Sequence, residues 1–145
     1  MGVGKSTVIN ALIGREIAPT SDLATSCTKN TQAYLSQVAK NLIVVDTPGF
    51  GDPTISTRNW IKDAQRVQNF DFDAIIYVIN STSRCSFELM VYTIVSKYLF
   101  QNYLHNRIIF FFTRCQTSGF TPQTGREYIQ TLWTNCKFYA PLPEH

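Results

Sequence analysis

The chain has 145 residues, of which 44% are hydrophobic, and its formal net charge is +3. This length and composition are typical of one globular domain with its own core, and they exclude an intrinsically disordered chain. Basic residues are scattered along the sequence, which gives no support for nucleic-acid binding. No run approaches the roughly 18 apolar residues that span a bilayer, so we expect no membrane association encoded in this chain. Four separated cysteines without a Cys-x-x-Cys pair favour reduced thiols in a cytoplasmic protein: Cys27, Cys85, Cys115 and Cys136.

The first residues match the second half of the sequence motif of a phosphate-binding loop. Gly4, Lys5 and Ser6 match the last three positions of the pattern Gly, four residues, Gly-Lys-Ser/Thr. In such loops glycines let backbone N–H groups turn toward phosphate oxygens, the lysine reaches the β- and γ-phosphates, and the hydroxyl coordinates Mg²⁺. The first glycine of the pattern and its strand would precede Met1. Taken alone, this segment could also be an ordinary turn that matches Gly-x-Gly-Lys-Ser by chance.

The pattern that follows predicts a helix and then an edge strand. Apolar residues at helical spacing predict a helix over residues 7–13, and Gly14 is a suitable C-terminal stop. Residues 15–27 are polar and loop-like. Loose alternation over residues 28–38 predicts an edge strand with Ala33, Leu35 and Val38 on one face.

A second motif lies about 40 residues after the first. The apolar run 42–45 ends in Asp46-Thr47-Pro48-Gly49. In nucleotide-hydrolysing folds the aspartate at this strand end holds Mg²⁺ through water, and the glycine amide faces the γ-phosphate. Two such motifs in the right order strongly favour a phosphate-binding site over a chance turn.

The remaining sequence predicts helices and strands in alternation. A helix is expected from Ser56 or Thr57 to about residue 68, with Trp60 buried. Strands are expected at 74–79 and 107–112, helices at 86–99 and 122–133, and a short last strand at 137–140. This alternation predicts an α/β fold with a mainly parallel sheet in one domain, residues 1–145, with the binding loops at the carboxyl ends of the strands.

Three segments carry a resemblance to a known family: 2–12 (GVGKSTVINAL), 44–52 (VVDTPGFGD) and 111–114 (FFTR). The chain resembles P-loop GTPase domains, and more narrowly the branch of septins, chloroplast import GTPases and immunity-associated GIMAP-type (AIG-type) GTPases. The resemblance covers roughly residues 2–135. It implies a three-layer P-loop NTPase G domain that is incomplete at its N-terminus, because the strand before the loop would precede Met1. A fragment is the favoured explanation, and a degenerate domain is the alternative.

The resemblance also implies roles for individual residues. Lys5 would contact the β- and γ-phosphates, Gly49 would sense the γ-phosphate through its amide, and Asp46 would bind Mg²⁺ through water. Thr28 would be the first-switch threonine that closes on Mg²⁺, with an ordinary strand-edge threonine as the alternative. The implied nucleotide-binding residues are Gly2, Val3, Gly4, Lys5, Ser6, Thr7, Gly49, Thr113, Arg114 and Gln116, and the implied metal-binding residues are Ser6, Thr28 and Asp46.

Two positions depart from the GTPase pattern. Phe50 stands where Ras-type GTPases place the glutamine that orients the attacking water, and a phenyl ring cannot do this. No catalytic residue is therefore assigned. The guanine-recognition motif Asn-Lys-x-Asp appears as Thr113-Arg114-Cys115-Gln116. Gln116 offers one acceptor oxygen where the family's aspartate accepts two hydrogen bonds, although Arg114 could still stack on a base.

These observations support two hypotheses of function. The first is a GTPase that binds GTP or GDP with Mg²⁺, hydrolyses GTP slowly, and acts as a molecular switch or assembly GTPase. The second is a catalytically weak or inactive nucleotide-binding module that assembles with copies of itself. The resemblance implies a homodimer or homo-oligomer across the nucleotide face. It also implies peripheral membrane attachment only through segments outside this domain in a longer parent. A third hypothesis, an ATP-using P-loop kinase, has weaker support, because no arginine-rich lid is evident in the sequence.

Overall fold

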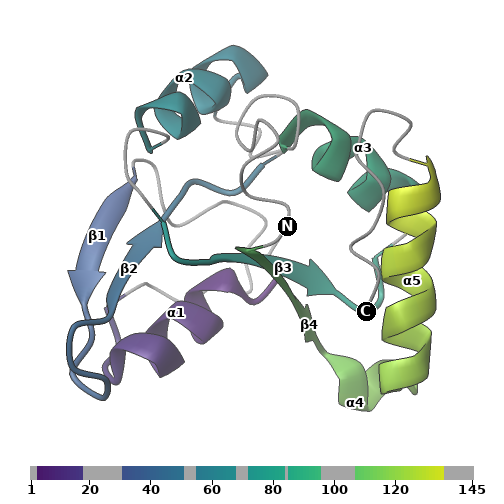
Figure 1. Cartoon of the computed structure of the whole chain (residues 1–145), viewed down its shortest axis with the longest axis horizontal. Coiled ribbons are helices and arrows are strands. Elements are labelled where there is room, and N and C mark those ends of the chain that lie inside the picture. The colour runs from purple at the N-terminus through teal and green to yellow at the C-terminus, as the bar shows by residue number, and fades with distance from the viewer. Residues whose placement is uncertain are drawn as a thin grey trace. The chain divides into compact units, whose positions relative to one another are not determined.

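The computed structural model describes residues 3–17, 31–50, 55–67, 72–83, 85–95 and 107–135. The chain divides into two compact units, unit 1 (Met1–Asn69) and unit 2 (Phe70–His145). Figure 1 shows that both units combine helices with strands, so the predicted α/β class is confirmed. Among the described residues, no helix has the length and apolar character needed to cross a membrane.

Unit 1 is built from a helix, a hairpin and a second helix. Its elements are α1 (Lys5–Ile13), β1 (Gln32–Leu35), β2 (Ile43–Asp46) and α2 (Thr57–Val67). β1 and β2 run antiparallel, with Gln32 opposite Asp46 and Leu35 opposite Ile43. Ser36 fixes the turn after β1, because its hydroxyl donates to Leu12 O at 2.7 Å and accepts from the Ala39 amide at 3.1 Å.

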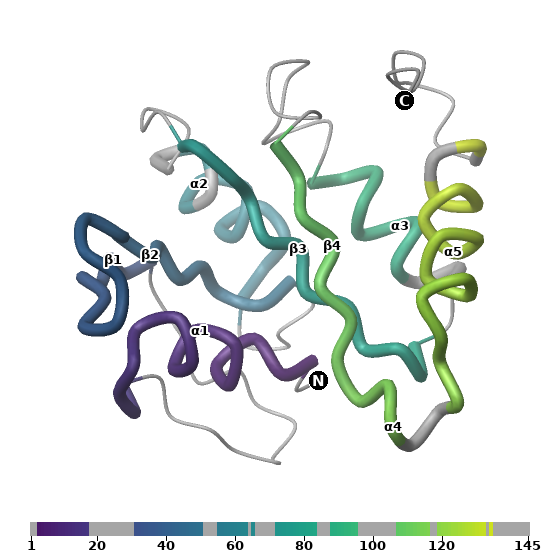
Figure 2. Tube along the Cα trace, turned by 60° about the horizontal axis from the view of Figure 1, so that its bottom comes forward, coloured from purple at the N-terminus to yellow at the C-terminus, as the bar shows by residue number. Residues whose placement is uncertain are grey.

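The core of unit 1 lies between α1 and one face of this hairpin. Ile9 and Ile13 are buried, and Ile17, Tyr34 and Val44 pack against them. Figure 2 shows α1 lying along the hairpin. Burial of the i, i+4 pair Ile9 and Ile13 explains why a nine-residue segment is helical here, since helices this short draw their stability from packing.

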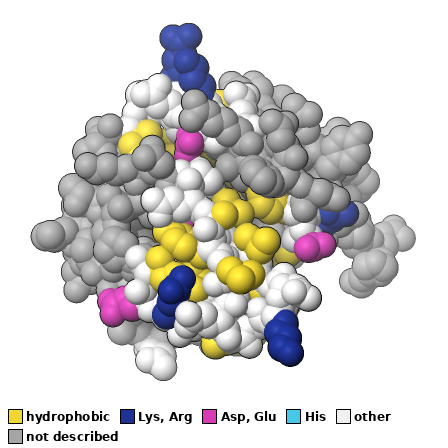
Figure 3. Space-filling model, turned by 90° about the vertical axis from the view of Figure 1, so that its left-hand side faces the viewer, with side chains coloured by type: hydrophobic (Ala, Val, Ile, Leu, Met, Phe, Trp, Pro, Cys, Tyr) yellow, Lys and Arg dark blue, Asp and Glu magenta, His cyan; other side chains and the backbone are white. Residues whose placement is uncertain are grey.

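The opposite face of the hairpin is exposed. Leu35, Val38 and Ile43 expose 62%, 69% and 65% of their surface. Figure 3 views the side of the molecule on which β1 lies in Figure 1, and hydrophobic side chains gather there. Ala33 and Leu35 do share a face, as alternation predicted, but that face is exposed and Tyr34 on the other face contacts the core.

Unit 2 contains a parallel strand pair with helices on one face. Its elements are β3 (Ile75–Asn80), α3 (Cys85–Val95), β4 (Ile108–Thr113), α4 (Cys115–Ser118) and α5 (Pro122–Asn135). β3 and β4 are parallel, with Ile75 opposite Ile108 and Asn80 opposite Thr113. α3 and α5 contact each other and lie side by side in Figures 1 and 2.

An aromatic cluster joins these helices to the sheet of unit 2. The rings of Tyr77 and Phe110 lie 5.6 and 5.8 Å from Tyr92 of α3. Phe112 lies 4.6 Å from Phe120 and 5.7 Å from Tyr128 of α5. Such tilted and edge-on ring pairs add to the stabilisation from burial alone. The alternate residues Ile76, Ile109 and Phe111 are partly exposed, at 38%, 51% and 44%.

Several predicted boundaries were wrong by a few residues. α1 begins at Lys5 instead of residue 7, because Gly4 has φ 88° and precedes the first helical turn. β1 is limited to Gln32–Leu35, and α4 was not predicted. The described strands form two separate two-stranded sheets, one antiparallel and one parallel, instead of one mainly parallel sheet. The strand at 137–140 and the end of the helix at 86–99 lie outside the described residues, and the single-domain assignment stays a prediction.

Candidate functional site

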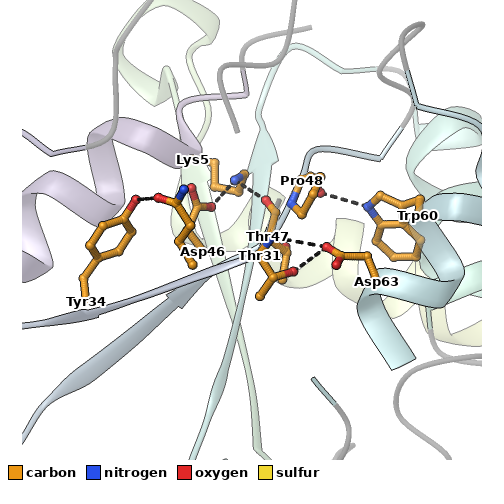
Figure 4. A network of polar contacts seen from close by, with 9 residues as sticks. Lys5, Thr31, Tyr34, Asp46, Thr47, Pro48, Trp60 and Asp63 are labelled. Atoms are coloured by element: carbon orange, nitrogen blue, oxygen red, sulfur yellow. Dashed lines mark hydrogen bonds and ion pairs between the residues drawn. The ribbon is translucent and has the colours of Figure 1, made fainter. Parts of the chain in front are cut away.

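The phosphate-side residues meet at the start of α1. Gly4 adopts φ 88°, a left-handed conformation that suits glycine, and its carbonyl accepts the first helical hydrogen bond from the Val8 amide at 3.1 Å. The Lys5 ammonium, in the first turn of the helix, donates to the Asp46 carboxylate and to the Thr47 carbonyl (Figure 4). Lys5 and Asp46 are 41 positions apart in sequence, so the fold brings the two motifs together.

This ion pair is placed where water is largely excluded. The Asp46 side chain exposes 1% of its surface and the Lys5 side chain exposes 25%. A buried carboxylate is costly without a charged or hydrogen-bonding partner. The Lys5 ammonium therefore compensates the Asp46 charge in unit 1, and a ligand that draws Lys5 away must provide for that charge in another way.

The loop after Asp46 is held by α2. The indole N–H of Trp60 donates to the Pro48 carbonyl at 2.8 Å, and the Trp60 ring meets Phe50 edge-on with centroids 5.0 Å apart. Ser56, one of the two residues at which the sequence predicted this helix to start, caps it by accepting from the Asn59 amide at 3.2 Å. Gly49 lies between the two anchored residues. Phe50 thus has a packing partner in place of a role in orienting water.

A second contact from α2, which the sequence did not predict, reaches the start of β1. The Asp63 carboxylate accepts from the Thr31 amide at 3.2 Å and from the Thr31 hydroxyl at 2.6 Å. Thr31 directly precedes Gln32, which lies opposite Asp46 in the hairpin. No local pattern marks this pair, because its members are 32 positions apart.

The predicted base-side residues lie in unit 2, at the end of β4. The Thr113 hydroxyl donates to Ile79 O at 3.3 Å, and its carbonyl accepts from the Ser81 amide at 3.0 Å. Arg114 has φ 58° and precedes α4, and both Arg114 and Gln116 are exposed. With Phe112 and Cys115 these two side chains line a shallow pocket.

Some predicted site residues cannot be placed in this way. Gly2 and Thr28 lie outside the described residues, as does the loop 51–54. Val3, Ser6 and Thr7 lie in the described segment around the start of α1. The described residues hold no group of three or more His, Cys, Asp and Glu side chains that could bind a metal ion. The hydroxyl of Ser6 and the carboxylate of Asp46 are hard oxygen donors, which fit Mg²⁺ completed by phosphate oxygens and water.

A glycine turn leading into a lysine at a helix N-terminus, with an aspartate at a strand end beside it, defines a P-loop nucleotide-binding protein of α/β fold. Comparison with known sequences narrows this class. Residues 1–114 match the family described as 50S ribosome-binding GTPase, and the chain belongs to this family. The match confirms the predicted P-loop GTPase resemblance, while the narrower septin and GIMAP branch stays a prediction.

A curated relative is the GTPase Era from Deinococcus radiodurans. It is 31% identical over 78 residues, which cover 54% of this chain and 25% of the relative. The chain therefore spans about a quarter of the length of this relative. The similarity therefore does not extend to the greater part of that protein.

Proposed function

We propose that this chain binds GTP and GDP with Mg²⁺ and hydrolyses GTP slowly, as a molecular switch or assembly GTPase. The contact of Lys5 with Asp46 and Thr47 O carries the proposal. It gathers at one helix N-terminus the cation that binds β- and γ-phosphates and the acid that binds Mg²⁺ through water. Family membership supports guanine nucleotide as the ligand.

Nucleotide binding would exchange the partners of Lys5. Its ammonium would leave Asp46 for the phosphates, and the amides of Val3, Gly4, Lys5, Ser6 and Thr7 would donate to phosphate oxygens. Asp46 would then face metal-bound water while the Ser6 hydroxyl ligates the ion. When bound, Mg²⁺ neutralises charge on the β- and γ-phosphates. The residues of this chain bind and orient the triphosphate for in-line attack by water.

Slow hydrolysis is proposed because of Phe50. Its ring packs on Trp60 with 5.0 Å between centroids and carries no group that can orient water. The missing polar group could come from a second copy of the chain across the nucleotide face. A catalytically weak module that binds nucleotide and assembles with itself is the second candidate, which the same observation favours.

One titration tests the proposal. Fluorescent GDP with Mg²⁺ is added to the purified chain and competed with unlabelled GTP and ATP. Saturable binding that GTP reverses and ATP does not is the expected result. Absence of saturable binding would overturn the proposal.

A hydrolysis assay then separates the two candidates. GTP turnover per molecule is measured over a range of chain concentrations. Turnover that rises with concentration indicates an assembly GTPase whose second copy completes the site. Slow turnover independent of concentration indicates a switch that acts as a monomer, and binding without turnover indicates the inactive module.

A further inference from the structure

One helix, α2, contacts a residue just before β1 and a residue just after β2, the strand that ends at Asp46. Trp60 and Asp63 lie three positions apart on α2, so they share a side of the helix. Figure 4 shows Trp60 directed toward Pro48 and Asp63 directed toward Thr31. Both contacts lie in unit 1, and neither was predicted from a sequence motif.

The Trp60 contact fixes the backbone after Asp46. Trp60 is 6% exposed, and its indole N–H donates to Pro48 O at 2.8 Å. A buried donor and acceptor that lost each other would each be left unsatisfied, which makes this bond costly to break. The edge-on contact with Phe50 holds the loop again two residues later. Gly49 is therefore held from both sides.

The Asp63 contact fixes the strand beside Asp46. Its Oδ2 atom accepts from both the amide and the hydroxyl of Thr31, at 3.2 and 2.6 Å. Hydrogen bonds to a carboxylate are stronger than neutral ones. Because Thr31 precedes the residue opposite Asp46, this pair ties α2 to the end of the ladder that presents the Asp46 carboxylate.

We propose that Trp60 and Asp63 are positioning residues that hold Gly49 and Asp46 for the γ-phosphate and Mg²⁺, and that α2 thereby distinguishes GTP from GDP. The inference rests on the proposed function. The γ-phosphate is present in GTP and absent from GDP, and Gly49 is the residue whose amide would face it. Loosening the Trp60 contact should therefore weaken GTP binding more than GDP binding. Loosening the Asp63 contact should act in the same direction, because Asp63 holds the helix that carries Trp60.

The test compares the dissociation constants of GDP and the slowly hydrolysed analogue GTPγS, both with Mg²⁺. Trp60→Phe keeps an aromatic ring for Phe50 and removes the N–H donor, while Asp63→Ala removes the acceptor at a partly exposed helix position. The ratio of the GTPγS constant to the GDP constant is expected to rise about 3- to 10-fold in each variant, because Trp60→Phe removes one hydrogen bond and Asp63→Ala removes the acceptor of two.

One control has the residue type of Trp60, and the other comes from the same helix as Asp63. Trp133→Phe changes the other tryptophan of the chain, and Gln65→Ala truncates an exposed residue of α2. Both are expected to keep the wild-type ratio. A purely structural role for Trp60 would lower stability, or weaken both nucleotides equally, and would leave the ratio unchanged.

Hydrogen exchange of the nucleotide-free chain supplies a second measurement. Trp60→Phe is expected to speed exchange of the Gly49 and Phe50 amides relative to Trp133→Phe.

If circular dichroism shows that Trp60→Phe does not fold, Asp63→Ala decides the question alone. An unchanged ratio in every folded variant would overturn this inference and leave the proposed function standing. Wild-type chain that binds neither nucleotide would overturn the proposed function, and this role of α2 with it.

Discussion

In unit 1 the Lys5 ammonium and the Asp46 carboxylate meet in a largely buried pair, whereas in unit 2 Arg114 and Gln116 are exposed at the start of α4. Asp46 is the last residue of β2, and Arg114 and Gln116 follow the end of β4. The two sets of residues differ in what holds them. Asp46 and its loop are bound to α1 and α2 by charged and indole hydrogen bonds. The turn at Arg114 contains a left-handed residue and is held by the Thr113 hydroxyl and carbonyl contacts.

The roles proposed for the two sets of residues differ as well. Phosphates present the same oxygens in every nucleotide, so a lysine with fixed neighbours can serve all of them. Base identity is read by side-chain donors and acceptors that must match one ring edge, and Gln116 is the residue proposed for that role. We therefore expect phosphate binding to depend strongly on unit 1, and base preference to be adjustable in unit 2.

Lys5→Ala should have the largest effect. It removes the phosphate cation and leaves Asp46, 1% exposed, without its ammonium partner. We expect nucleotide affinity to fall by on the order of 100-fold or more, and stability to fall by roughly 3 kcal/mol, since an uncompensated buried charge is strongly destabilising. Isothermal titration with GDP and urea unfolding measure the two effects. Lys40→Ala, at the exposed turn between β1 and β2, is the matched control, and equal behaviour of the two variants would contradict the prediction.

Gly14→Ala and Gly119→Ala compare the two units without touching the site. Both glycines have positive φ, 83° and 63°, so alanine is strained at each. A Cβ at Gly14 would also overlap the Val38 side chain, while nothing lies within 4 Å of a Cβ at Gly119. We expect losses of about 2–3 kcal/mol and about 1 kcal/mol respectively. Chemical denaturation checks this, and a larger loss at Gly119 would contradict it.

Gln116→Asp tests the base-side assignment. An aspartate accepts two hydrogen bonds from guanine where glutamine offers one acceptor oxygen. We expect the ratio of the ATP and GTP dissociation constants, measured by competition against fluorescent GDP, to rise about tenfold. Gln123→Asp, an exposed position of α5, should leave it unchanged. The assignment of Gln116 to the base fails if ATP and GTP compete in the wild-type proportion in both variants.

Sequence patterns predicted the bounds of the helices and strands better than the tertiary contacts that these elements make. Glycine chemistry and helical periodicity located the end of α1 at Gly14, and continuous apolar runs located β3 and β4 to within about one residue, because these signals are local. The face of the hairpin was not predictable in the same way. Alternation says that Ala33 and Leu35 share a face, but which face α1 covers depends on tertiary packing.

The same contrast holds for the candidate site: residues in motifs were predicted, and long-range contacts were not. Lys5 and Asp46 could both be assigned to the site in advance because each belongs to a motif with a defined role, whereas their ion pair was not predicted. Trp60 was predicted to be buried, yet its bond to Pro48 O depends on how a loop meets a helix. The Asp63–Thr31 pair has no sequence signature, since any aspartate on a helix can be solvent-exposed or bonded. Long-range polar contacts are therefore what the structure adds.

Glu88→Gln should give a smaller, pH-dependent effect in unit 2. Glu88 exposes 4% of its surface in the first turn of α3. Burial raises the pKa of the Glu88 carboxyl above its ordinary value, opposed by hydrogen bonds from Ser83 and Tyr77. The pKa of Tyr77 is raised as well, first by burial and then by Glu88, so its hydroxyl stays protonated. An acid with a raised pKa in the folded state binds its proton more tightly there than in the unfolded chain.

The sign of the pH dependence follows from this. Glu88 contributes stability that is present below its unfolded pKa and lost as pH rises through its folded pKa. Glutamine carries no such charge, so Glu88→Gln is expected to raise the free energy of unfolding at pH 7. At pH 4, where the carboxyl is largely protonated in the folded state, the gain should shrink toward zero. Glu127→Gln, at an exposed position of α5, should show no such trend. A Glu88→Gln gain that is the same at both pH values would mean that packing, and not the buried charge, sets its effect.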